Sequence, residues 1–222
     1  VSEASFRVVA HFLLPDGKTT LRAELNRRLK DCDEAEAFLQ VCQKPTTTFT
    51  IEDTTKRPLK KSPAPPFTTS TLQQEAARKL GFSVAQTMMV AQRLYEAGFI
   101  TYMRTDSFNL SDVALKASHE AIVGEYGERY HKLRRYHTKS KGAQEAHEAI
   151  RPTNMGVPEI NAGAQENRLY DLIYKRTLAC QMADAELERT TISIGIGGRT
   201  DKFVAVGEVI KFDGYLRVYR ES

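Results

Sequence analysis

The stretch KRPLKKSPAPPFTTSTLQQEAARKLG, residues 56–81, separates two kinds of sequence pattern and so decides the fold class. Its first part, residues 56–66, combines basic charge with four prolines, and proline suits neither a central strand nor a helix interior. We interpret this part as a linker or hinge. After it, Leu72, Ala76 and Leu80 follow helical spacing and Gly81 comes next, which is typical of an amphipathic helix that ends at a glycine.

The sequence before residue 56 has the character of β-strands. Apolar and polar residues alternate in two runs within residues 6–25, and the turn residues Pro15-Asp16-Gly17 separate the runs. This pattern predicts a hairpin. Asp33 and Glu36 have the spacing of a capping box and predict a short helix to about Cys42.

The sequence after residue 81 is mainly helical. Ser83 is a suitable N-cap for a second helix that runs to Gly98, and two capped helices separated by a tight turn resemble a helix-turn-helix. Further helices are predicted at Asp112–Val123, with Ser111 as the cap, and at Gln165–Met182.

Strand-like alternation returns after Glu188, and Asp213-Gly214 predicts a turn near the end. A β, α, β order along one chain predicts an α+β fold in which a helical domain is inserted into a β-rich domain. The predicted β domain comprises residues 1–61 and 189–222, and the predicted helical domain, with its winged-helix or CAP-like helix-turn-helix unit, comprises residues 62–188.

Composition favours a soluble globular protein, with 41% hydrophobic and 27% charged residues among 222. The sequence has no apolar run of membrane-spanning length and no secretion signal, so we expect a cytoplasmic protein. Its three cysteines lack metal-ligand spacing. The net charge of +4 is mild, but basic residues gather at 56–61 and 131–141, which suits either phosphate contacts or solvated loops.

The segment FITYMRTDS, residues 99–107, carries the sharpest chemical signal. In an extended segment Tyr102 and Arg104 point to the same side, so one phosphate could meet both. A tyrosine hydroxyl with pKa near 10 is about three units, or roughly 4 kcal/mol, from ionisation at pH 7, and a permanently charged arginine helps to offset that cost. The predicted chemistry is covalent catalysis through a phosphotyrosine. Spacing alone is more typical of a packed ring beside a surface charge, and Asp106 either caps a turn or holds Arg104.

The second segment is QEAHEAIRPT, residues 144–153. His147 is a candidate proton carrier or phosphate donor, because its reference pKa lies near neutrality. Arg151 follows four residues later, one turn away if the segment is helical, and is a candidate DNA contact. We interpret Glu145 and Glu148 as orienting or surface groups.

These two segments, with PPFTTSTLQQEA at residues 65–76 and TMMVAQRLYEAG at residues 87–98, resemble the central part of the bacterial type IA DNA topoisomerases. The resemblance implies that Tyr102 becomes linked to the 5′ phosphate of a cut single strand, that Arg104 binds the scissile phosphate and that His147 assists. It also implies that the helical block is the family's domain III and the β portions its arch-forming domain II. Such enzymes pass a strand through the break and reseal it without ATP, relaxing negative supercoils.

The resemblance also implies what other parts of such an enzyme supply. The family's magnesium-binding Toprim acids have no counterpart in this sequence, so we expect Mg²⁺ in the full-length enzyme but none bound by this chain, and no cleavage by the chain alone. The expected partners are a single-stranded segment of negatively supercoiled DNA and the Toprim and other domains of the same polypeptide. The expected location is the cytoplasm, at the nucleoid.

Three other interpretations remain open. A non-catalytic helix-turn-helix module would read duplex DNA in the major groove and would be indifferent to Tyr102. A tyrosine recombinase would also form a phosphotyrosine, but with a 3′ linkage. A purely structural arch would bury Tyr102 against a neighbouring domain.

Overall fold

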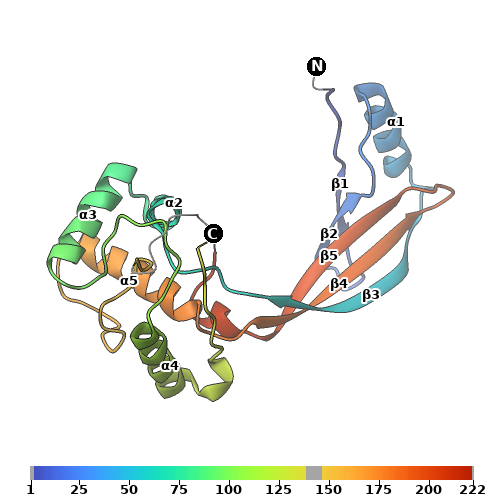
Figure 1. Ribbon diagram of the computed structural model, residues 1–222. Coiled ribbons are helices and arrows are strands. Elements are labelled where there is room, and N and C mark those ends of the chain that lie inside the picture. The colour runs from blue at the N-terminus through green and yellow to red at the C-terminus, as the bar shows by residue number, and fades with distance from the viewer. Residues whose placement is uncertain (1–2, 139–146, 222) are drawn as a thin grey trace. The chain divides into compact units, whose positions relative to one another are not determined.

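The computed structural model describes residues 3–138 and 147–221, and the chain forms two compact units. Unit 1 comprises Val1–Leu59 and Leu187–Lys211, and unit 2 comprises Lys60–Glu186 and Phe212–Ser222. The elements of unit 1 are β1 (Val9–Leu13), β2 (Thr20–Leu25), α1 (Cys32–Gln43) and most of β3 (Phe49–Lys61), β4 (Ala185–Ile196) and β5 (Lys202–Phe212) (Figure 1).

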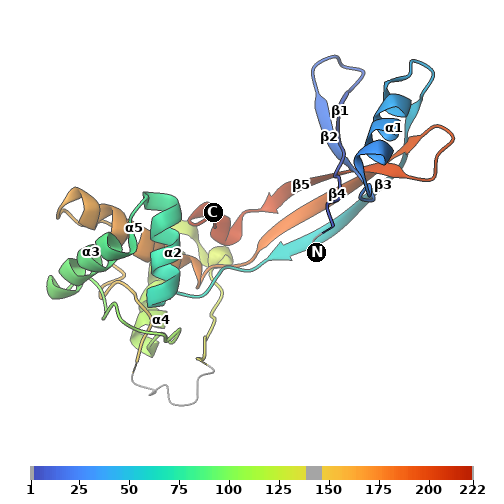
Figure 2. The ribbon, with the colours of Figure 1, turned by 90° about the horizontal axis from the view of Figure 1, so that it is seen from above.

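The five strands form one sheet in the order β1-β2-β5-β4-β3. β2 pairs antiparallel with both β1 and β5, and Leu25 lies opposite Phe203. One face of the sheet packs against α1, where Phe38 is 2% exposed and its ring lies 5.9 Å from that of Phe203. Each such buried aromatic contributes about 1.5–3 kcal/mol. Figure 2 shows α1 beside the strands from a second direction.

The structure confirms the predicted hairpin and corrects two details of unit 1. α1 begins at Cys32 because the side chain of Asp31, not of Asp33, accepts the hydrogen bond from the Glu34 backbone N–H at 2.8 Å. The predicted linker is wrong over its first half, since β3 continues to Lys61 and includes Pro58. β3 is the last strand in the sheet order, and an edge strand tolerates a residue without a backbone N–H.

Unit 2 is helical. Its helices α2 (Thr69–Leu80), α3 (Val84–Glu96) and α4 (Asp112–Tyr126) all contact α5 (Ala164–Ala179), and it also contains two short 3₁₀ turns, η1 (Glu128–Tyr130) and η2 (Gly214–Arg217). In Figures 1 and 2 the other helices surround α5. Nine of the 16 residues of α5 are buried, so it is the central element of this unit.

The predicted helix ends agree closely with the structure. Gly81 ends α2 in the left-handed conformation at φ 70°, while Ser83 and Ser111 cap α3 and α4 through their side chains. α4 runs three residues beyond the predicted Val123, and α5 ends three residues before the predicted Met182. α2 and α3 pack against each other, but such a pair is common in helical domains, so the winged-helix or CAP-like unit stays a prediction.

The last residues belong to the helical unit, whereas the sequence pattern placed 189–222 with the β domain. The Tyr219 hydroxyl donates to Glu75 at 2.6 Å and accepts from Arg176 at 3.2 Å, which ties this segment to α2 and α5. Tyr219 is 4% exposed, and burial raises its pKa above the ordinary value. Among the residues described, no helix has both the length and the apolar character needed to cross a bilayer.

Candidate active site

The segment that carries Tyr102 follows α3 and is fixed on one side by residues 149–151. The backbone N–H of Thr101 donates to the carbonyl of Arg151 at 2.9 Å, and the Thr101 hydroxyl donates to the carbonyl of Ala149 at 2.7 Å. The backbone N–H of Arg151 donates back to the Thr101 hydroxyl at 2.9 Å. These bonds join two segments that lie about 50 residues apart in the sequence.

The N-terminus of α2 fixes the other side of the segment. The hydroxyl of Thr69 donates to the carbonyl of Met103 at 2.8 Å and accepts from the backbone N–H of Thr105 at 2.8 Å. The side chain of Met103 is only 1% exposed. The backbone on both sides of Tyr102 is therefore held by hydrogen bonds, which is the kind of preorganisation that a reacting group needs.

Tyr102 itself is exposed and lies at a cavity. Its side chain is 48% exposed, and its ring packs edge-on against Tyr95 with 5.2 Å between the ring centroids. The cavity has a volume of about 190 Å³, and its lining is Thr101, Tyr102, Thr105, His147 and Glu148. The structure thus brings together Tyr102 and His147, two residues that the sequence places 45 positions apart.

Arg104 and Asp106 belong to the same segment as Tyr102, which has bends at Thr101 and Met103. Both are exposed, as is Tyr102, whereas Met103 and Ser107 between them are buried. The lining of the cavity does not include Arg104, and within the described part of the chain no ion pair joins Arg104 to Asp106. Tyr102 and Arg104 are thus both exposed, but the segment bends at Met103 between them and the lining of the cavity does not include the Arg104 guanidinium, so their convergence on one phosphate stays a prediction.

His147 is exposed and belongs to an extended segment rather than a helix. Its carbonyl accepts a hydrogen bond from the Ser107 hydroxyl at 2.7 Å. Isolated bridges pair Ile150 with Phe67 and Pro152 with Ile100, so the segment is not helical and His147 and Arg151 are not related by a helical turn. The predicted flanking residue Glu145 lies outside the described residues.

Arg151 and Glu148 form a paired unit at the edge of the cavity. Two nitrogens of Arg151 donate to the two carboxylate oxygens of Glu148, at 3.1 and 2.8 Å, and a third donates to the carbonyl of Pro152 at 3.0 Å. Only 12% of the Arg151 side chain is exposed. Its guanidinium is therefore committed within the protein, which does not favour the predicted contact with DNA.

The environment of Glu148 keeps its carboxylate charged. Burial acts to raise the pKa of Glu148, but the hydrogen bonds from Arg151 and from the Ser111 backbone N–H outweigh it and lower this pKa below the ordinary value. A carboxylate with its acceptor positions in use is a poor proton acceptor, so we assign it to holding the site together. The charge spacing of Glu148 and Arg151 was visible in the sequence, but their burial was not.

The basic tract 131–141 is largely neutralised where the structure describes it. Arg134 and Lys132 both pair with Asp184, at 2.6 and 3.4 Å, and Arg135 pairs with Asp112 at 2.7 Å. Positions 139–141 lie outside the described residues. Up to residue 138, Lys132, Arg134 and Arg135 of the tract are therefore paired with carboxylates of their own unit rather than forming a row of free cations.

No cluster of three or more His, Cys, Asp or Glu side chains in residues 3–138 and 147–221 has an arrangement that could hold a metal ion. Cys32, Cys42 and Cys180 are free thiols, and Cys180 is fully buried, which raises its pKa to about 12.

Comparisons with known proteins agree on one family. The family model for DNA topoisomerase matches residues 1–222. The DNA topoisomerase 1 of Zymomonas mobilis is 44% identical over 203 residues, which are 90% of this chain and 17% of that protein. The Synechocystis DNA topoisomerase 1 is 48% identical over 195 residues, or 86% of this chain and 22% of that protein.

A solved structure gives the same result. Full-length topoisomerase I from Thermotoga maritima superposes with a TM-score of 0.79 at 32% identity, over 99% of this chain and 36% of that one. The chain spans about a fifth of the length of the curated relatives described above. It belongs to the bacterial type IA DNA topoisomerase family and corresponds to a part of its full-length members.

Proposed function

We propose that this chain supplies the nucleophilic tyrosine of an enzyme that transiently cuts one DNA strand. Tyr102 forms a 5′-phosphotyrosine, a second strand passes through the break, and the break is resealed without ATP, so that negative supercoils relax. The observation that carries the proposal is an exposed tyrosine, held by hydrogen bonds on both sides, that shares a cavity with His147.

The proposed reaction exchanges one phosphodiester for another. The phenolic oxygen of Tyr102 attacks the phosphorus, the new O–P bond forms, and the bond to the 3′ oxygen of the neighbouring nucleotide breaks. The leaving 3′ oxygen takes up a proton, and the phenol loses one. Resealing is the reverse attack by the 3′ hydroxyl, which returns the proton to the tyrosine. Because bond type is conserved, the cycle needs no external energy source.

The roles of the neighbouring residues follow from their chemistry. Arg104, permanently charged and on the exposed side of the segment, binds the scissile phosphate once DNA is in place. His147 is the proton carrier in the cavity, because the other ionisable neighbour, Glu148, is engaged with Arg151 and Ser111. Asp106 supports Arg104. We assign Arg151 to positioning.

Other parts of the complete polypeptide complete the site in this proposal. A Toprim domain holds Mg²⁺, and further domains help to hold a single-stranded segment of negatively supercoiled DNA. The enzyme works in the cytoplasm, at the nucleoid. Since the Toprim acids of the family have no counterpart in this sequence, the chain by itself is expected to be inactive.

The test uses the complete polypeptide that contains this segment. Tyr102→Phe removes only the nucleophilic oxygen, so relaxation of negatively supercoiled plasmid should fall below detection while the thermal unfolding midpoint stays unchanged. Tyr126→Phe, in α4, is the matched control and should relax plasmid like the parent. Normal relaxation by the Tyr102→Phe enzyme would refute the proposal.

The packed pair α2 and α3 supports a second candidate, a duplex-binding helix-turn-helix module. That candidate predicts that Tyr102→Phe leaves all DNA-dependent activity intact and that denaturant traps no covalent adduct. A trapped adduct with a 3′ rather than a 5′ linkage would instead indicate recombinase chemistry.

A further inference from the structure

The sheet of unit 1 has a second face that α1 does not cover. Strand register separates the two faces: Leu25 and Phe203 are paired and belong to the core beneath α1, whereas Glu24 is paired with Val204 on the opposite face. Arg22, two residues before Glu24, lies on that opposite face as well. Within the described residues α1 is the only helix of unit 1, so no helix of this unit covers the Arg22 face.

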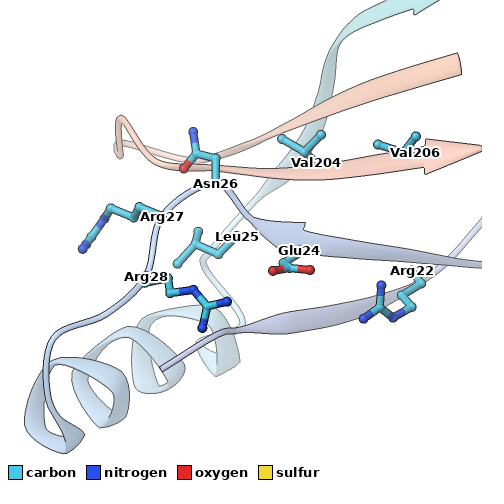
Figure 3. Close-up of a pocket in the computed structure, with 8 residues that line it drawn as sticks. All are labelled: Arg22, Glu24, Leu25, Asn26, Arg27, Arg28, Val204 and Val206. Atoms are coloured by element: carbon cyan, nitrogen blue, oxygen red, sulfur yellow. The ribbon is translucent and has the colours of Figure 1, made fainter. Parts of the chain in front are cut away.

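A cavity opens at the end of β2 on this side. It has a volume of about 560 Å³, and its lining is Arg22, Glu24, Leu25, Asn26, Arg27, Arg28, Val204 and Val206 (Figure 3). Arg27 is committed elsewhere, since it pairs with Glu34 at 2.7 Å and with Asp201 at 3.1 Å, and Figure 3 shows it pointing away from the other labelled side chains.

The remaining charges leave the cavity positive. Glu24 is 3.7 Å from Arg7, so its carboxylate is already partnered. Arg22 and Arg28 are exposed and have no ion pair in the part of the chain that the structure describes. In Figure 3 they lie on either side of Glu24. Two arginines are therefore available to a ligand, against a single carboxylate that has its own partner.

Asn26 adds a directed donor. Its side-chain oxygen accepts from the backbone N–H of Lys202 at 3.2 Å, and its own backbone N–H donates to the carbonyl of Lys202 at 2.9 Å. Because the amide oxygen is used, its NH₂ group is the end left to bind a ligand. The polar groups that this cavity offers are thus mainly donors, which favours an anion.

The apolar lining narrows the class of anion. The apolar residues of the lining are Leu25, Val204 and Val206; Val206 is 59% exposed, and the lining includes no aromatic ring. Branched aliphatic side chains can contact a deoxyribose, whereas the lining has none of the aromatic side chains on which successive bases stack in single-strand-binding proteins. Forked guanidinium groups beside a small apolar floor suit a phosphate and its sugar.

We propose that this cavity binds the phosphodiester backbone of a single-stranded DNA segment. The side chains of Arg22, Arg28 and Asn26 donate hydrogen bonds to its phosphates. That the anion is DNA rests on the proposed function, whereas the donor set rests on the geometry of unit 1. Binding here is independent of base sequence and uses residues of unit 1, whereas Tyr102 belongs to unit 2.

The test measures binding of a fluorescent single-stranded oligonucleotide of mixed sequence to the 222-residue chain over a range of salt concentrations. The double variant Arg22→Gln/Arg28→Gln should bind more weakly. Each lost phosphate contact flattens the slope of log K against log salt by about 0.7, so two contacts flatten it by about 1.4. The control Lys18→Gln/Lys44→Gln removes the same charge from exposed positions outside the cavity and should keep the parent slope.

Hydrogen exchange then locates the site. The oligonucleotide should slow amide exchange in residues 20–28 and 203–206 of the parent but not of the Arg22→Gln/Arg28→Gln variant. Equal slopes for this variant and the control, or no protection in these residues, would overturn the proposal. A duplex that binds more tightly than the single strand, with the same dependence on both arginines, would overturn the single-strand assignment.

The binding test of this cavity can fail or succeed independently of the test of Tyr102. A Tyr102→Phe chain should show the same salt slope and the same protection of unit 1 as the parent. Loss of the Tyr102 adduct therefore says nothing about this cavity, and an unchanged salt slope says nothing about Tyr102.

Discussion

At the scale of residues, exposure distinguishes Tyr102 from tyrosines that serve the fold. The hydroxyl of Tyr170 donates to the carbonyl of Val157 and that of Tyr174 to the carbonyl of Met155, and burial raises the pKa of Tyr170 to about 12. Such hydroxyls are harder to ionise and are already engaged. Tyr102 is 48% exposed at the edge of a cavity, where a phosphate can reach it.

Glu148→Gln tests the positioning role of Glu148. Removing the charge weakens its hydrogen bonds with Arg151 and Ser111, and we expect a loss of about 1.5–3 kcal/mol in the free energy of unfolding at pH 7. Because the folded state lowers the pKa of Glu148, this stabilisation is complete above the ordinary pKa of 4.5 and disappears as the pH falls through the lower folded value.

Urea unfolding at a series of pH values measures the effect. The difference between parent and Glu148→Gln should be constant near neutrality and should close in acid, below about pH 4.5. Glu120→Gln, at an exposed position of α4, should match the parent throughout. A difference that grows as the pH falls would contradict the assignment.

At the scale of elements, helix boundaries were predictable because their signals are local. Gly81, Ser83 and Ser111 act within one helical turn of their own positions, so sequence alone located them. The segment around Pro58 was wrongly predicted to be a linker. A strand can include a proline when it lies at the edge of a sheet, and that position depends on the strand order, which local sequence does not reveal.

The N-terminus of α2 should control activity through Thr69. Its hydroxyl holds the backbone of Met103 and Thr105 on one side of Tyr102. Thr69→Val keeps the shape and removes these bonds, so we expect relaxation by the complete polypeptide to slow roughly 10-fold to 100-fold. Thr69→Ser keeps the hydroxyl and should stay near the parent rate. Equal rates for the two variants would exclude this role.

Gly214 should tolerate no side chain. It lies at φ 52°, and an added Cβ would be 2.4 Å from the carbonyl oxygens of Ala183 and Asp184. Gly214→Ala should lower the free energy of unfolding by about 1–3 kcal/mol. Gly207→Ala, in β5, meets no atom within 4 Å and should be neutral or slightly stabilising. Denaturant unfolding measures the free energy of unfolding of both variants, and equal values would contradict the prediction.

At the scale of the whole molecule, the pattern of strands, then helices, then strands predicted two units built from interleaved parts of the chain. The return of Phe212–Ser222 to the helical unit was not predictable, because it depends on contacts of Tyr219 with Glu75 and Arg176, residues far away in the sequence. The cavity beside Tyr102 was not predictable for the same reason. The sequence identified the segments that contain Tyr102 and His147, but hydrogen bonds between these distant segments bring them together.

The isolated chain should not cut DNA. Incubated with negatively supercoiled plasmid and Mg²⁺, it should produce no nicked or relaxed product, because in the proposed enzyme the magnesium-binding acids belong to another part of the polypeptide. The complete polypeptide in the same buffer is the positive control. Efficient magnesium-dependent nicking by the 222-residue chain would show that it carries a complete site.

The identity of the nucleophile can be read from the covalent complex itself. The complete polypeptide is denatured during cleavage of a single-stranded oligonucleotide, digested with protease and nuclease, and analysed by mass spectrometry. We predict that the nucleotide is attached through its 5′ phosphate to the Tyr102 oxygen and that the released strand has a free 3′ hydroxyl. An adduct on any other residue, or a link through a 3′ phosphate, would contradict the assignment of Tyr102.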